Sequence, residues 1–187
     1  MNTLTNTLHS LGIGLALALV ASSAFAEISH NHNHHSLRQH DAHEHGFAQL
    51  NVAIDSNILM LEFTSPAANI IGFEHRIKNN EEQKIYDAAV QQLKQPAILF
   101  SANSEALCAI TELDVSSSLD SDKAHKQHHD FSAEYTFTCH NIKELAHIHT
   151  KLLHMFPNTQ EVQVQIIDNN GQRTTQLNQF NHTIKFK

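Results

Sequence analysis

Histidine is the residue type in this chain with the most obvious chemistry, since 17 of its 187 residues are histidine. Neutral imidazole is a borderline ligand that suits zinc, copper and nickel, and zinc takes about four ligands in a tetrahedron. Seven of the sixteen residues from His30 to His45 are histidine, which predicts metal binding by this segment. The alternative is a solvated linker that binds no metal.

Spacing within this segment favours shared ligation. Histidines two residues apart in extended chain point the same way and can reach one ion. We predict that the segment folds around the ion at a cost in chain entropy, and that acid releases the metal because imidazole protonates near pH ~6.5. The candidate ligands in this segment are His30, His32, His34, His35, His40, His43 and His45.

Two further places in the chain offer histidine ligands. A polar loop over residues 116–130 holds His125, His128 and His129, which form a second candidate metal-binding group. The alternative for these three is simple solvation. His75 follows Gly-Phe-Glu and is either a ligand or a turn residue, because its spacing alone does not decide between the two.

Catalysis has little support in the sequence, and we predict that the protein is not an enzyme. The His43-Glu44-His45 run has the wrong spacing for an HExxH metalloprotease motif, and the GxSxG and glycine-rich phosphate-binding motifs are absent. A zinc-dependent hydrolase with ligands distant in sequence is the alternative with least support. The net charge of −7, with histidine neutral, argues against a nucleic-acid partner.

The N-terminal residues predict export. An apolar block spans Leu11 to Ala21, and Ala24-Phe25-Ala26 is a small-x-small cleavage pattern before Glu27. The alternative is a short N-terminal membrane anchor, although the block is short for a membrane span. We therefore expect a periplasmic protein without stable membrane insertion after processing. Its expected parts are a signal peptide at 1–26, a flexible histidine-rich tract at 27–45 and a single α+β domain at 46–187.

The two cysteines, Cys108 and Cys139, predict a disulfide, because an even number of cysteines in an exported chain meets an oxidising compartment. Both fall on apolar faces of predicted strands, as a buried bridge requires. The competing interpretations are two buried thiols or thiolate metal ligands.

Alternating apolar residues predict most of the domain to be strand. A hairpin is expected around Asp55-Ser56-Asn57, and Asn170-Gly171 is the best hairpin signal in the chain. The expected strands are 50–54, 58–63, 97–100, 106–115, 131–139 and 162–166.

Two helices are expected to pack against this mainly antiparallel sheet. The first begins at Asn79 or Asn80 and ends near Leu93, before Pro96. The second is predicted over 142–156, with an apolar stripe that includes His149 as a core histidine. The buried face of the first helix is predicted to contain Ile85, Ala88, Ala89 and Leu93.

Several segments together resemble a known family. They are HEHGFAQLNV at residues 43–52, SPA at 65–67, IGFEH at 71–75, ALC at 106–108, YTFTC at 135–139 and FP at 156–157. With the preceding histidine-rich tract, they make the chain similar to the ZrgA-like periplasmic zinc-uptake proteins of Gram-negative bacteria. The resemblance covers essentially the whole chain after the signal peptide.

The resemblance implies a function and a site. It implies periplasmic zinc binding that assists uptake, by supplying an ABC-type importer or its solute-binding protein. It implies a core zinc site at His43, His45 and His75, and it supports a Cys108–Cys139 bridge. One departure from the family pattern is the Arg76-Ile77 pair after His75, where relatives often have proline two residues on.

A second class of function is a periplasmic buffer or resistance protein that sequesters zinc, copper or nickel. The ligand types do not distinguish a zinc-uptake protein from a buffer or resistance protein, because imidazole sites bind copper more tightly than zinc.

Overall fold

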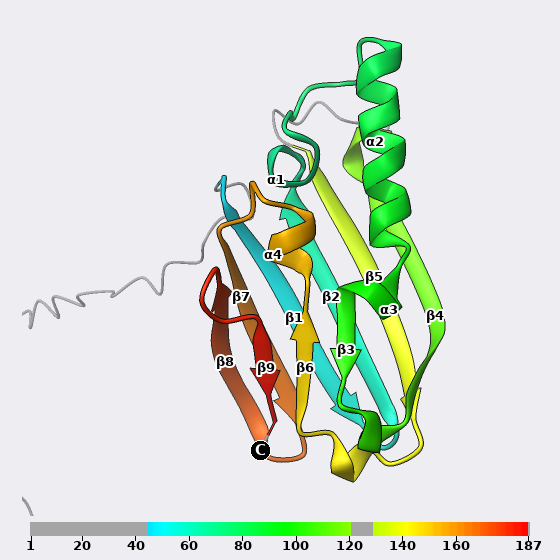
Figure 1. The fold of residues 1–187 in the computed structure, drawn as a ribbon, viewed down its shortest axis with the longest axis vertical. Coiled ribbons are helices and arrows are strands. Elements are labelled where there is room, and N and C mark those ends of the chain that lie inside the picture. Colours follow the sequence, from blue (N-terminus) through cyan, green and yellow to red (C-terminus); the bar gives the residue numbers. More distant parts are fainter. Residues whose placement is uncertain (1–44, 121–128, 187) are drawn as a thin grey trace, which may run out of the picture. The chain divides into compact units, whose positions relative to one another are not determined.

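The computed structural model describes residues 45–120 and 129–186 (Figure 1). The predicted signal peptide, the tract up to residue 44, and His125 and His128 lie outside these residues, so the predictions made for them stay predictions. Within 45–120 and 129–186, the helices are too short or too polar to cross a membrane.

The described chain is mostly strand, with one long helix and several short ones. In chain order the elements are β1 (Phe47–Asp55), β2 (Ile58–Pro66), α1 (Ala67–Ile71), α2 (Asn80–Leu93), α3 (Pro96–Leu99), β3 (Phe100–Ala102), η1 (Ser104–Ala106), β4 (Cys108–Ser117), η2 (Ser118–Asp120), β5 (Asp130–Cys139), η3 (Ile142–Glu144), β6 (His147–Thr150), α4 (Leu152–Met155), β7 (Glu161–Asp168), β8 (Gly171–Asn178) and β9 (Thr183–Lys185).

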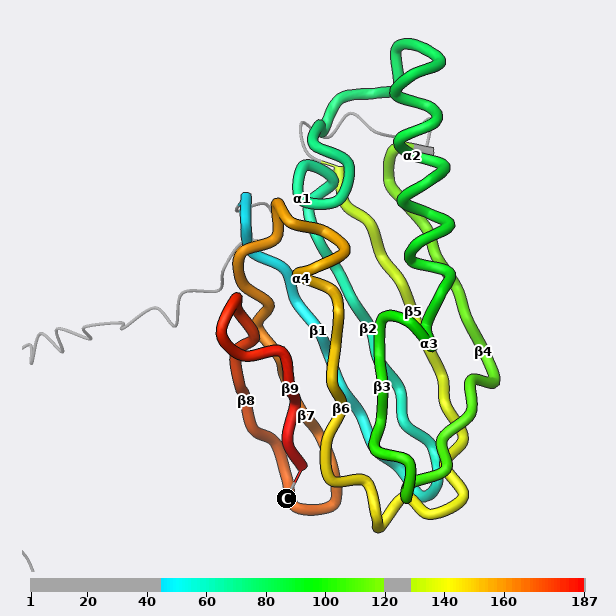
Figure 2. The backbone as a smooth tube through the Cα atoms, viewed as in Figure 1, coloured from blue at the N-terminus to red at the C-terminus, as the bar shows by residue number. Residues whose placement is uncertain are grey.

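The strands form two sheets. The larger sheet has the order β4-β5-β2-β1-β7-β8, and the smaller one has the order β3-β6-β9. Among the described strands, β1 and β7 pair in parallel and the other neighbours are antiparallel. The smaller sheet, α2, α3 and α4 lie over one face of the larger sheet (Figures 1 and 2). The predicted α+β class with a mainly antiparallel sheet is therefore confirmed.

The central hairpin forms because apolar residues alternate on both of its strands. Leu50 and Val52 of β1 are buried and pair with Phe63 and Leu61 of β2. Ser56 adopts a left-handed conformation (φ 55°) in the turn between the strands. The sequence prediction of a hairpin at this turn is confirmed, and the buried face of the hairpin points toward the smaller sheet.

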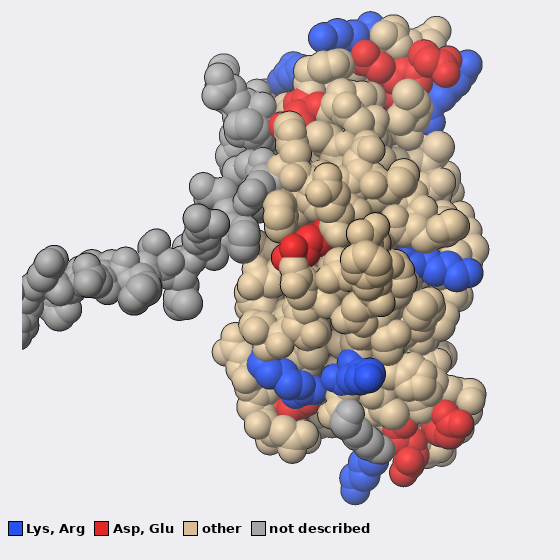
Figure 3. Space-filling model, turned by 60° about the vertical axis from the view of Figure 1, so that its left-hand side comes forward, with Lys and Arg blue, Asp and Glu red and all other residues tan. Residues whose placement is uncertain are grey.

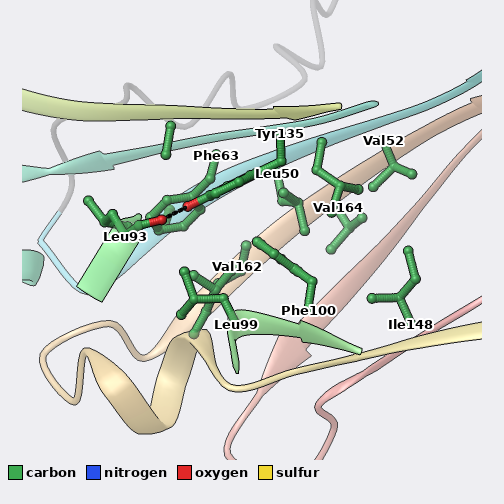
Figure 4. Packing of buried hydrophobic residues seen from close by; sticks show 14 of the residues in the cluster. Leu50, Val52, Phe63, Leu93, Leu99, Phe100, Tyr135, Ile148, Val162 and Val164 are labelled. Carbon is green, nitrogen blue, oxygen red and sulfur yellow. Dashed lines mark hydrogen bonds between the residues drawn. The ribbon is translucent and has the colours of Figure 1, made fainter. Parts of the chain in front are cut away.

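The core lies between the two sheets (Figure 4). Tyr135 of β5 is buried, and its ring packs edge-on against Phe100 of β3 at a centroid distance of 5.2 Å. The Tyr135 hydroxyl donates to the Leu93 carbonyl at 2.8 Å, which joins the end of α2 to the sheet. Burial raises the pKa of Tyr135, so this hydroxyl stays protonated and remains a donor.

The prediction of a second long helix is wrong. The segment contains η3, β6 and α4 instead, because residues 147–150 alternate, with Ile148 and Thr150 buried and the histidines between them exposed. Two β-branched residues on the buried face favour a strand. His149 is consequently exposed on β6, and its prediction as a core histidine is also wrong.

Two smaller predictions need correction. The proposed strand at 97–100 is largely α3, because Pro96 occupies the first helical turn, where its missing N–H costs nothing, and the strand begins at Phe100. In α2 the buried face contains Tyr86 with Ala89 and Leu93, whereas the predicted Ile85 and Ala88 are exposed. Tyr86 turns inward because its ring packs on Phe131, at 5.5 Å between centroids.

The Cys108–Cys139 disulfide is present, as the sequence predicts. The two cysteines are direct cross-strand partners at the ends of β4 and β5, with their Cα atoms 3.8 Å apart. The bridge therefore ties the outermost strand of the larger sheet to its neighbour.

We expect that Cys108→Ala combined with Cys139→Ala will lower the free energy of unfolding by about 2–5 kcal/mol, because a 31-residue separation is no longer cross-linked in the unfolded chain. Alanine avoids placing a hydroxyl in the buried Cys139 position. Urea denaturation of the oxidised wild type, the reduced wild type and the double variant measures the effect. If reduction leaves the unfolding midpoint unchanged, the bridge has no stabilising role.

Candidate metal centre

The short helix α1 joins the two segments that carry the predicted core ligands. Asn69 in this helix is buried, and its side chain accepts a hydrogen bond from the Gly46 N–H at 2.7 Å. The same side chain donates to the Phe47 carbonyl at 2.9 Å and to the Ser65 hydroxyl at 3.2 Å. The start of β1, immediately after His45, is therefore fixed to α1 by one amide side chain.

Gly46 is needed at this junction for its conformation and for its size. Its φ of +87° lies in the left-handed region, and an added Cβ would come within 3.2 Å of the Gln160 side chain. Its carbonyl accepts from the N–H groups of Gln160 and Glu161 at 2.7 and 3.0 Å. The backbone immediately after His45 is therefore held by hydrogen bonds from Gly46 to α1 and to the start of β7.

The other end of α1 leads to the second segment. Gly72 caps the helix in a left-handed conformation, and its N–H donates to the Ala68 carbonyl at 3.0 Å. Glu74 follows, and its Oε1 lies 3.0 Å from Nε2 of His45. This contact brings the segment with His45 and the segment with His75 to one corner of the domain, which we call the α1 corner (residues 45–46 and 67–75).

The hydrogen bonds of His45 and His75 leave one nitrogen of each ring available to a metal. An ionised carboxylate only accepts, so Nε2 of His45 donates to Glu74 and Nδ1 keeps its lone pair. A backbone carbonyl also only accepts, so Nδ1 of His75 donates to Arg76 at 2.9 Å and Nε2 keeps its lone pair. Metal-binding histidines commonly donate their second N–H to such an acceptor, which orients the ring.

The ring of His75 is also held by packing. It stacks on Phe73 with centroids 4.9 Å apart and planes 16° apart. Glu82, in the first turn of α2, has its Oε2 3.9 Å from Nδ1 of His75. The same carboxylate accepts from the Lys78 N–H at 2.7 Å, so the ring lies beside a well-fixed anion that favours a cation nearby.

A complete ligand set is not assembled by the described residues alone. Within 45–120 and 129–186, no three histidine, cysteine, aspartate or glutamate side chains are grouped so that they could hold a metal ion. The third predicted core ligand, His43, lies outside these residues. The structure brings His45 and the 73–75 segment together, and the full ligand set of His43, His45 and His75 stays a prediction.

The third histidine-bearing segment also meets α1. His129 is buried, and its carbonyl accepts from the Ala67 N–H at 2.7 Å at the start of the helix. Its Nδ1 lies 3.4 Å from the Ser118 hydroxyl. His129 therefore forms part of the packed fold next to α1, in contrast to simple solvation, which was the alternative to metal binding, and its role as a ligand remains a prediction.

Sequence analysis missed three residues in or next to this corner. Glu74 and Glu82 carry a signal only in hindsight, as carboxylates one residue before and seven residues after His75. Asn69 has no sequence signal, because a buried asparagine is recognised only once its backbone partners are known.

We expect Asn69→Ala to lower the free energy of unfolding by about 2–4 kcal/mol, because the Gly46 N–H and the Phe47 carbonyl lose their partner. The same variant is expected to weaken zinc binding by the chain. Asn158→Ala is the matched control, since the exposed Asn158 side chain donates to Ala68 of the same helix at 3.3 Å. Urea denaturation and zinc titration of both variants provide the measurement. If Asn69→Ala and Asn158→Ala unfold with equal free energies, the Asn69 side chain does not hold α1 to the start of β1.

Comparison with known proteins gives one family. The profile of the ZrgA family zinc uptake protein matches residues 42–186. This range begins one residue before His43 and includes the α1 corner. None of the curated proteins compared with the chain matches it.

Proposed function

The chain belongs to the ZrgA family of zinc uptake proteins, and from this we propose that it is a periplasmic accessory protein that captures Zn²⁺ through histidine clusters and supplies it to an importer. The observation that carries the proposal is the convergence of three histidine-bearing segments on α1. His45 contacts Glu74 at 3.0 Å, and the backbone of His129 bonds to Ala67. A site at this corner can draw ligands from all three segments.

We infer a division of roles between the tract and the corner. The tract offers many ligands but must lose chain entropy to bind, so its sites bind zinc with moderate affinity and exchange it readily. His45 and His75 are oriented before the metal arrives, by Glu74 and by Arg76 with Phe73 respectively. Preorganised ligands lose less entropy on binding, so the corner is expected to hold the tightest zinc.

The recipient of the zinc is inferred from the direction of transport. An importer of the ABC type, or the solute-binding protein that serves it, needs zinc delivered in the periplasm. Exchangeable histidine sites suit such delivery, because zinc can pass between imidazole ligands one at a time. The protein acts in this proposal as a carrier with zinc as its cargo.

Zinc accumulation in cells tests the proposal. A strain that lacks the protein is expected to take up zinc more slowly and to grow poorly when a chelator limits zinc, with recovery on added zinc. Expression of the protein is expected to rise under zinc starvation. Sensitivity of the strain to excess zinc, copper or nickel, with normal growth under chelation, would instead identify a buffer or resistance protein.

A further inference from the structure

A second pair of histidines lies on the smaller sheet. His149 in β6 and His182, the residue before β9, have ring centroids 6.2 Å apart with planes inclined by 67°. The antiparallel pairing of β6 with β9 places them together, because His149 pairs with Thr183 and the Thr150 N–H donates to the His182 carbonyl at 2.9 Å. Backbone hydrogen bonds therefore hold the segments that carry the two rings side by side.

Each ring of this pair keeps a nitrogen for a ligand. Nε2 of His182 lies 3.2 Å from the Gln179 carbonyl and must donate to it, so Nδ1 of His182 keeps its lone pair. Nδ1 of His149 lies 3.4 Å from the Thr183 hydroxyl, which can accept its proton, and in that tautomer Nε2 of His149 keeps its lone pair for a ligand. A ring held by one nitrogen and open at the other is the arrangement that metal sites use.

The separation of the rings suits one shared ion after a small movement. Two imidazoles that bind one tetrahedral ion at about 2.1 Å have centroids about 5 Å apart. The observed 6.2 Å requires a closure of about 1 Å. His149 is exposed and His182 is half-buried, so rotation of the side chains is not blocked by the core.

One ring of the pair borders open space. His182 lines a hollow of about 680 Å³ between α4 and the loop before β9, together with His154 and Glu161, whereas His149 lies outside this lining. Figure 3 shows the side of the molecule where β8 and β9 come forward, with charged side chains of both signs in its middle as well as toward its ends.

We propose that His149 and His182 together bind one borderline divalent transition-metal ion, Zn²⁺ or Cu²⁺, with water in the remaining positions. This rests on the proposed function only in taking the metal as cargo, because the pair lies on β6 and just before β9 and uses no residue of the α1 corner. With two protein ligands, the site binds more weakly than one with three. By the general order of metal affinities, it binds Cu²⁺ more tightly than Zn²⁺.

Site-specific protection of the histidine rings tests this proposal in the full mature chain. Zn²⁺ is titrated, and modification of each histidine by diethyl pyrocarbonate is followed by peptide mass spectrometry. Zinc is expected to protect His149 and His182 over the same concentration range. In His182→Ala, half-protection of His149 is expected to need at least about tenfold more zinc, because the second ligand no longer acts intramolecularly.

His140→Ala is the matched control for this experiment, because His140 is exposed and lies outside both β6 and β9. His147 is not used as a control, because it lies on the same face of β6 two residues before His149 and can reach the same ion. Protection of His149 is expected to be unchanged in this control. His182→Gln is measured alongside His182→Ala, so that the result does not depend on one variant.

The outcomes separate this proposal from the proposed function. If zinc protects histidines of the tract and of the α1 corner but leaves His149 and His182 reactive, the second site is overturned and the proposed function stands. If protection of His149 is the same in wild type and His182→Ala, the two rings do not share an ion. If zinc protects none of the histidines, the proposed function fails together with the second site.

Discussion

Alanine at His43, His45 and His75 together is expected to remove the tightest zinc-binding event of the mature chain and to leave weaker events in place. The reason is the preorganisation of the α1 corner. Glu74 orients His45, while the Arg76 carbonyl and the Phe73 ring orient His75. Ligands that are already oriented lose little entropy when they bind, so the affinity lost with them is larger than for the same number of tract histidines.

Isothermal titration calorimetry of the mature chain with Zn²⁺ measures this result, with a competing chelator to resolve the tightest event. The matched control is His140→Ala combined with His147→Ala and His154→Ala, which removes three exposed histidines from other places on the domain. This control is expected to keep the tightest event. If the corner variant keeps it and the control loses it, the core ligands lie away from α1.

The elements that sequence analysis predicted correctly are those with a single periodicity. Leu50 and Val52 in β1, like Val162 and Val164 in β7, alternate without ambiguity and are buried as predicted. Residues 142–156 satisfy two periodicities at once, since Leu145, Leu152 and Phe156 also lie at helical spacing. Residues 147–150 form a strand because they pair with both β3 and β9. A local sequence pattern does not contain this information, because the pairing partners are distant in sequence.

The disulfide and the candidate site also follow only in part from the local sequence. The even number of cysteines predicts that Cys108 and Cys139 form a bridge, and the register of β4 on β5 shows why they are close enough to do so. His45 and His75 were connected through resemblance to a family, and their contact through Glu74 depends on a helix of five residues that has no strong pattern of its own. The buried Asn69 that holds this helix to β1 was beyond prediction, because its partners are backbone atoms 22 and 23 residues away.

Deletion of residues 29–40 is expected to lower the number of zinc ions bound by the mature chain without a change in its stability. These twelve residues contain five of the histidines and no apolar periodicity from which a core could be built. The buried hydrophobic cluster of the domain, by contrast, draws on strands from β1 to β9. The tract is therefore expected to contribute capacity for metal and little folding energy.

The matched control replaces His30, His32, His34, His35 and His40 by asparagine in a chain of unchanged length. Both variants are measured by zinc titration and by urea denaturation in the absence of metal. An equal loss of capacity in the two assigns the effect to imidazole ligands, whereas a loss confined to the deletion assigns it to chain length. If the deletion lowers the unfolding midpoint, the tract is part of the folded domain and its description as a metal-collecting appendage is wrong. Persistence of the tightest binding event in both variants is also expected, because we propose that this event belongs to the α1 corner, which begins beyond the deleted residues.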